Sequence, residues 1–103
     1  MSNFVDVEST GEANDNDDVA VDGTVGGVIL LAANPARKSA LIINTGDADM
    51  RVTTDGSAPT ATHGKLVGSG AALSLSSPYC PTKEVKAIRQ TSTSTTANAS
   101  EVD

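Results

Sequence analysis

Two side chains of types that do nucleophilic or acid–base chemistry occur once each: His63 and Cys80. A catalytic triad needs a histidine placed between a Ser or Cys nucleophile and an orienting acid. His63 lies in the loop sequence ATHG, and none of the many serines sits in a G-x-S-x-G turn. Cys80 stands between Pro78 and Pro81, with only Lys83 nearby as a cation that would favour a thiolate. We therefore expect no enzymatic activity and no small-molecule substrate, with a solvated loop histidine and a buried or loop thiol.

The sequence NDNDD at residues 14–18, followed by Asp22 and Gly23, has the oxygen ligands that calcium prefers. It lacks the full register of an EF-hand loop. The alternatives are a bound cation, a solvated acidic segment, and acids that lie along a basic stripe of a partner; we favour the partner over the cation. The sequence GSG at 68–70 is followed by no Lys-Ser/Thr pair, which excludes a phosphate-binding loop and indicates a turn. One cysteine forms neither a disulfide framework nor a cysteine zinc site, so we expect no metal and no cofactor.

The chain has 103 residues, which corresponds to one domain, with one Phe, one Tyr and no Trp. Its core must therefore be aliphatic, at roughly 25 cal/mol per Å² of buried apolar surface. Such a core offsets chain entropy narrowly, so we expect contacts between subunits and a homo-oligomer. There is no apolar run of 18 residues, and we expect no membrane contact.

The net charge of −6 argues against nucleic acid as a partner, because phosphates are neutralised by clustered Lys and Arg. The charge is concentrated at one end: residues 1–22 hold seven acids and no base, and the rest holds six acids and seven bases. We predict an acidic, extended N-terminal arm over residues 1–18 and a folded domain over 19–103. The first 20 residues have no basic segment, so we expect no signal peptide and synthesis in a cytoplasm.

Short runs rich in Val, Ile, Leu and Thr, separated by Gly, Pro, Asn and Asp, predict about seven strands and no helix. We expect an all-β fold, a single small antiparallel β-sandwich of jelly-roll-like form. The sequence NTGDAD at 44–49 predicts a β-hairpin turn, with Gly46 at positive φ. The threonine-rich tail predicts a last strand at a sheet edge.

Residues 41–43 are Leu-Ile-Ile, apolar on both faces of the predicted strand. Leu41 and Ile43 share one face and Ile42 the other, which indicates a strand buried on two sides. One face would form the core, and the other would contact a subunit or a covering arm. Arg37 and Lys38, at the start of this strand, are either solvated turn cations or partners for the acidic arm of a neighbouring copy.

From residue 33 to 102 the sequence runs ANPARKSALIINTG, a VTT strand, GKLVGSGAALSL, a proline–tyrosine loop, EVKAI and a Ser/Thr-rich last strand. This arrangement resembles the small β-sandwich virion proteins of tailed bacteriophages. The resemblance implies a structural protein of the virion, assembled in a bacterial host cytoplasm. It points first to a capsid decoration or cement protein that binds the major capsid protein or other virion proteins. The alternatives are a tail, neck or head-fibre component, or a displayed receptor- or carbohydrate-binding module, for which the scarcity of aromatic side chains is unfavourable.

The predicted partner-binding residues belong to the arm and to the pair of cations before residue 39. An apolar anchor in the arm and charges along it would contact a neighbouring protein, with the charges giving register more than affinity. These residues are Phe4, Val5, Asp6, Glu8, Asp15, Asp17, Asp18, Arg37 and Lys38.

Overall fold

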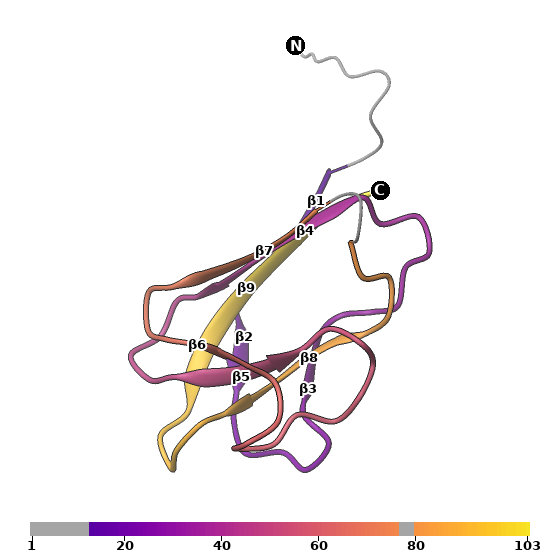
Figure 1. Ribbon diagram of the computed structural model, residues 1–103. Coiled ribbons are helices and arrows are strands. Elements are labelled where there is room, and N and C mark those ends of the chain that lie inside the picture. The colour runs from indigo at the N-terminus through magenta and orange to yellow at the C-terminus, as the bar shows by residue number, and fades with distance from the viewer. Residues whose placement is uncertain (1–12, 77–79) are drawn as a thin grey trace.

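The computed structural model describes residues 13–76 and 80–103, and these contain nine strands and no helix (Figure 1). Two sheets pack face to face, as Figure 1 shows. The strands are β1 (Ala13–Asp15), β2 (Val19–Val21), β3 (Val28–Leu31), β4 (Ser39–Asn44), β5 (Met50–Thr53), β6 (Lys65–Val67), β7 (Ala72–Ser76), β8 (Val85–Arg89) and β9 (Thr95–Val102).

The strand order of both sheets is that of a jelly roll. One sheet runs β1-β9-β4-β7, with β2 also paired to β9, and the other runs β3-β8-β5-β6. Every ladder is antiparallel. Successive strands from β2 to β9 change sheet at every step except β5 to β6, which is how two Greek keys interleave. The predicted all-β antiparallel sandwich is confirmed.

The predicted hairpin at residues 44–49 is wrong, because β4 and β5 lie in opposite sheets. This turn instead crosses the end of the sandwich, and Asn44 holds it from inside. The Asn44 side chain is fully buried; its Nδ2 donates to Ala48 O at 2.7 Å and to Val67 O at 2.9 Å. Its Oδ1 accepts hydrogen bonds from Gly46 N and from the Thr95 hydroxyl. A buried amide with all these bonds formed fixes a crossover that local turn chemistry does not distinguish from a hairpin.

Gly46 is required for a different reason from the predicted one. It is not among the described glycines with positive φ. A Cβ at this position would collide with the Thr95 hydroxyl and would lie 2.6 Å from Thr96 N. The turn therefore needs glycine for the close approach of β9, not for a left-handed conformation.

The predicted edge position of the last strand is also wrong. β9 is the longest strand and lies between β4 on one side and β1 and β2 on the other. Its inward side chains are small: Thr95, Ala97 and Ala99 are all buried. Small side chains let the facing sheet approach closely, so a threonine- and alanine-rich strand can occupy the centre of the fold.

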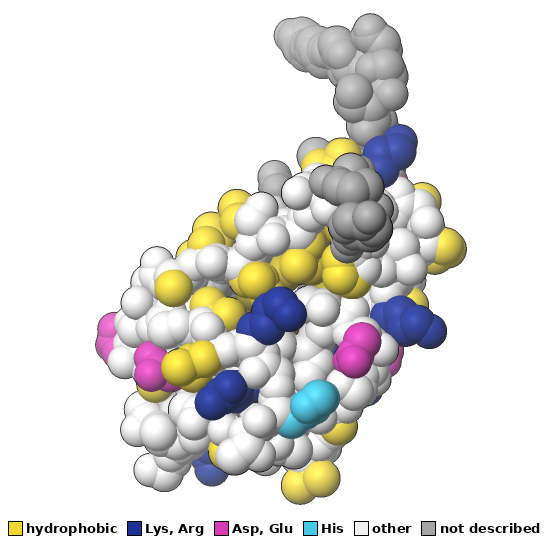
Figure 2. Space-filling model, viewed as in Figure 1, with side chains coloured by type: hydrophobic (Ala, Val, Ile, Leu, Met, Phe, Trp, Pro, Cys, Tyr) yellow, Lys and Arg dark blue, Asp and Glu magenta, His cyan; other side chains and the backbone are white. Residues whose placement is uncertain are grey.

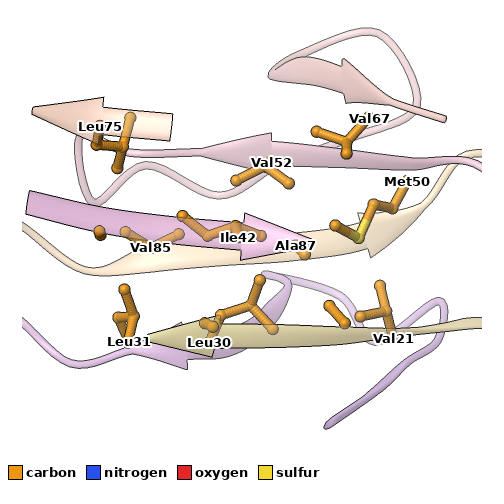
Figure 3. Close-up of a cluster of buried hydrophobic side chains, with 13 residues drawn as sticks. Val21, Leu30, Leu31, Ile42, Met50, Val52, Val67, Leu75, Val85 and Ala87 are labelled. Atoms are coloured by element: carbon orange, nitrogen blue, oxygen red, sulfur yellow. The ribbon is translucent and has the colours of Figure 1, made fainter. Parts of the chain in front are cut away.

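The core is aliphatic, as the composition predicts (Figure 3). Its largest fully buried apolar side chains are Ile42, Met50, Val21, Val52 and Val85, drawn from both sheets. The one Phe and the one Tyr, Phe4 and Tyr79, lie outside the described residues, so no aromatic ring contributes to the described core.

Candidate interaction surface

Leu41 and Ile43 lie on one face of β4 and Ile42 on the other, as the sequence predicts, but the described residues do not bury both faces. Ala40 and Ile42 point into the core, whereas Leu41 and Ile43 point outward. Leu41 is 40% exposed, which is unusual for a leucine at the centre of a sheet. The described residues do not cover it.

The outward positions of β4, β7 and β9 form what we call the outer face. None of these positions carries a charged side chain, although the whole chain has a net charge of −6. A hollow of about 250 Å³ lies at one end of this face, where Ser39, Ser76 and Val102 meet. The members of the outer face are Ser39, Leu41, Ile43, Ala72, Ser74, Ser76, Thr96, Asn98, Ser100 and Val102.

The end of the predicted arm that the structure describes belongs to this same sheet. In β1, Ala13 is opposite Val102, and Asp15 is opposite Ser100. Val102 is in turn opposite Ser39 on β4. Residue 13, where the described chain begins, therefore lies near the hollow of the outer face.

Asp18 is hydrogen-bonded to side chains of its own sheet and of the turn after β4. Its carboxylate accepts hydrogen bonds from Asn98 Nδ2 at 3.0 Å and from the Thr45 hydroxyl at 3.2 Å. Asn16 Nδ2 donates to Ala99 O at 2.9 Å. These bonds attach residues 16–18 to β9, while the side chain of Asp17 is exposed.

Among the side chains that the structure describes, in residues 16–76 and 80–103, no group of three or more metal-ligating residues gathers, and Asp17, Asp18 and Asp22 form no such group. Asp22 accepts hydrogen bonds from the hydroxyl of Thr24 and then from its backbone N–H, and these lower the pKa of the Asp22 carboxyl below the usual 3.8. Its role is to cap a local turn.

Arg37 is not a solvated turn cation; its side chain is fully buried. Nε donates to Glu101 Oε1 at 2.8 Å, and the other guanidinium nitrogens donate to three backbone carbonyls. The fork geometry of a guanidinium suits this set of acceptors. The buried ion pair joins the β3–β4 connection to β9 and to the segment before β8, so this cation is not available to an arm. The carbonyls belong to Ala32, Pro81 and Lys83.

Lys38 is exposed, as the sequence predicts, and its backbone N–H donates to Val102 O at 2.7 Å. It stands beside the hollow of the outer face. Four predicted contact residues of the arm, Phe4, Val5, Asp6 and Glu8, lie outside the described residues.

His63 has neighbours that its sequence context did not reveal. Its Nε2 lies 3.0 Å from Ser57 Oγ, and the Ser57 hydroxyl donates to Asp55 Oδ1 at 2.5 Å. A hydroxyl has one hydrogen, so His63 Nε2–H must be the donor to Ser57. A nucleophilic serine requires the opposite direction, with histidine accepting the proton. The arrangement braces the loop after β5, and the sequence signal for it is the Asp-x-Ser turn at residues 55–57.

Cys80 is partly buried and packs against the core, in agreement with the expected buried or loop thiol. Within the described residues, no helix is long and apolar enough to cross a membrane.

The outer side of the β3-β8-β5-β6 sheet differs from the outer face in two ways. It carries charge, with Lys86 paired to Glu84 and Arg51 bonded to Gln90 and to Gly64 O. It is also partly covered by its own chain, because Pro59 is fully buried against Gly27 and Lys86. The uncharged, open surface is thus confined to one sheet.

The fold and the surface together define a small jelly-roll β-sandwich in which the outward positions of β4, β7 and β9 carry no charge. Comparisons with protein-family models, with curated proteins and with solved structures found no match to this chain.

Proposed function

We propose that the chain is a non-enzymatic structural protein of a bacteriophage particle, a capsid decoration or cement protein. It would bind the major capsid protein through the outer face and through the arm that joins the same sheet. The resemblance of residues 33–102 to small phage virion proteins supports a phage virion as the particle. The uncharged outer face supports a contact with another protein through that face.

The observation that carries the proposal is the uncharged outer face in an acidic protein. Charged groups resist burial, because each must lose water on binding. A face built from serine, alanine, threonine and an exposed Leu41 meets another protein surface without that penalty. Ser74 and Ser100 beside Leu41 supply hydroxyls for hydrogen bonds with a polar shell.

The mechanism would be multivalent bridging. Each copy contributes a modest interface, and many copies on a symmetric shell act together. The acids of residues 1–12, Asp6, Glu8 and Glu12, would add register and faster association. Stability of the shell would then rise with occupancy and fall when the outer face is altered.

Co-sedimentation of the purified chain with particles that lack it tests the proposal. The particles come from the phage that encodes the chain. We expect saturable binding, and we expect Leu41→Lys to weaken it by roughly tenfold or more, since it places a charge in the contact.

The matched control is Leu66→Lys, which places the same charge at a leucine that is 53% exposed on the opposite sheet. We expect wild-type binding from this variant. Equal loss from both variants, or no binding of the wild-type chain, would contradict the proposal.

A further inference from the structure

Among the described strands, none pairs with the outer edge of β7, and β7 lacks the features that protect sheet edges. Soluble proteins usually guard edges with charge, proline, a bulge or extreme shortness. β7 has five residues, an unbroken ladder to β4, no charge and no proline. The uncharged sequence extends well beyond it, since residues 66–82 contain no Asp, Glu, Lys or Arg.

The other edges of the two sheets carry such features. β3 has a register shift between Ile29 and Leu31. β6 has three residues and begins at the exposed Lys65. β1 and β2 have three residues each, and the acids Asp15, Asp17 and Asp18 lie in or between them. β7 is the exception within the described fold.

The free hydrogen-bonding groups of β7 follow from its pairing with β4. Asn44 N donates to Ala71 O, and residues alternate along an antiparallel ladder. Leu73 and Leu75 therefore direct N–H and C=O toward β4. The same groups of Ala72, Ser74 and Ser76 point to the open edge.

The core is also less completely covered at this edge. Leu73, on β7 itself, is only partly buried against the core. In Figure 2, hydrophobic side chains gather in a band across the middle of the view, in the region where Figure 1 places β7 above β6. A strand added beyond β7 would cover part of this band.

We propose that β7 pairs with β7 of a second copy, antiparallel about a two-fold axis at Ser74. Ser74 is then opposite the partner's Ser74, and Ala72 is opposite the partner's Ser76. This register satisfies the free N–H and C=O of all three residues. It also places Leu73 and the partner's Leu75 side by side on the core side of one continuous sheet.

Because the edge of β7 carries no charge, a second copy of the chain is the partner strand that fits it best. At a two-fold contact each residue near the axis meets its own kind, so any charge there would meet a like charge. The edge carries none. The acidic residues 1–12, with Asp6, Glu8 and Glu12, find no cation along β7 to compensate them. This inference does not depend on the proposed attachment to a particle.

The dimer must be weak in dilute solution. A five-residue edge buries far less than the roughly 1,200–2,000 Å² of a stable interface. Self-association should therefore depend strongly on concentration, and it would strengthen when copies are held close together.

Sedimentation equilibrium of the full chain with charge variants at position 74 tests the register. Ser74→Lys and Ser74→Glu each place like charges opposite one another, and each should weaken self-association by roughly fivefold. An equimolar mixture of the two variants should restore it, because opposite charges then meet. Ser100→Lys, on the outer face two strands away, should leave self-association unchanged, as should removal of residues 1–12.

Amide hydrogen exchange gives a second readout that is independent of the variants. Raising the concentration should slow exchange at Ala72, Ser74 and Ser76, while Leu73 and Leu75 stay protected throughout. Four outcomes would overturn the inference. The first is a monomer at every concentration, and the second is self-association that Ser74→Lys and Ser74→Glu leave unchanged. The third is an equimolar mixture of these two variants that does not restore self-association. The fourth is loss of self-association on removal of residues 1–12 or in Ser100→Lys.

Discussion

Arg37 donates a hydrogen bond of 2.8 Å from Nε to Glu101 Oε1, and this ion pair is closed off from solvent on the arginine side. The arginine side chain is fully buried and the glutamate is 16% exposed. Sixty-four positions separate the two residues in the sequence. The pair fastens the end of β9 to the start of β4.

Arg37→Ala should lower the free energy of unfolding by about 3–5 kcal/mol, because it leaves Glu101 and three carbonyls without their donor. Arg37→Lys should recover little of this, since an ammonium lacks the planar fork. Urea denaturation measures both. Lys86→Ala is the control: its pair with Glu84 is partly exposed and should contribute less than about 1 kcal/mol. Equal effects at positions 37 and 86 would contradict the buried role of Arg37.

Gly46→Ala should destabilise the fold by about 1–3 kcal/mol or more, because the added Cβ meets the Thr95 hydroxyl and the Thr96 backbone. Gly68→Ala is the matched control, since its Cβ would have only Asp49 Oδ1 near it, at 3.5 Å. Thermal unfolding compares the two. A larger loss of stability in Gly68→Ala than in Gly46→Ala would contradict the close approach of β9 to residues 44–49.

Asn44→Asp should destabilise the protein strongly at neutral pH. The amide donates to Ala48 O and Val67 O, and a carboxylate would face these two carbonyls without a hydrogen to give. Leaving buried acceptors unsatisfied costs about 1–3 kcal/mol, and more when a charge is involved. The loss should shrink on acidification, as the new carboxyl takes up a proton. Denaturation at two pH values measures this, and a loss independent of pH would count against the buried network.

Protonation of Asp55 should make the free energy of unfolding fall at low pH. The Ser57 hydroxyl, and then the Ser57 backbone N–H, hold the pKa of the Asp55 carboxyl below its usual 3.8. A lowered folded-state pKa gives stability that is present above 3.8 and is lost as the pH falls through the lowered value. Asp55→Asn removes this titration, so the variant should lose less stability than the wild type between about pH 4 and pH 2. Asp22 provides the comparison, because its own bonds to Thr24 leave it titrating in both proteins.

The strands and their faces were predictable because side chains alternate in the sequence itself. That Leu41 and Ile43 share one face of β4 and Ile42 lies on the other follows from period two, and the structure shows that Ile42 is the inward one. The jelly-roll pairing was harder to predict. Whether residues 44–49 form a hairpin or a crossover is decided by Asn44 reaching Val67 and Thr95, and these contacts are far apart in sequence.

The candidate surface was predicted in part. The sequence predicted that Leu41 and Ile43 share a face, but it did not show that this face points outward or that Arg37 is buried. Its counter-charge, Glu101, lies in the last strand, which sequence patterns placed at an edge. The brace of Asp55, Ser57 and His63 was missed for a similar reason, since the loop brings its ends together only in the fold.

We propose that the chain is a structural protein whose uncharged outer face binds a capsid shell. The most direct measurement is saturable co-sedimentation of the purified chain with particles that lack it, run side by side with Leu41→Lys and Leu66→Lys. We expect saturable binding of the wild type and of Leu66→Lys, and weaker binding of Leu41→Lys by roughly tenfold or more. Binding that Leu41→Lys leaves intact, or no binding by the wild type, would contradict it.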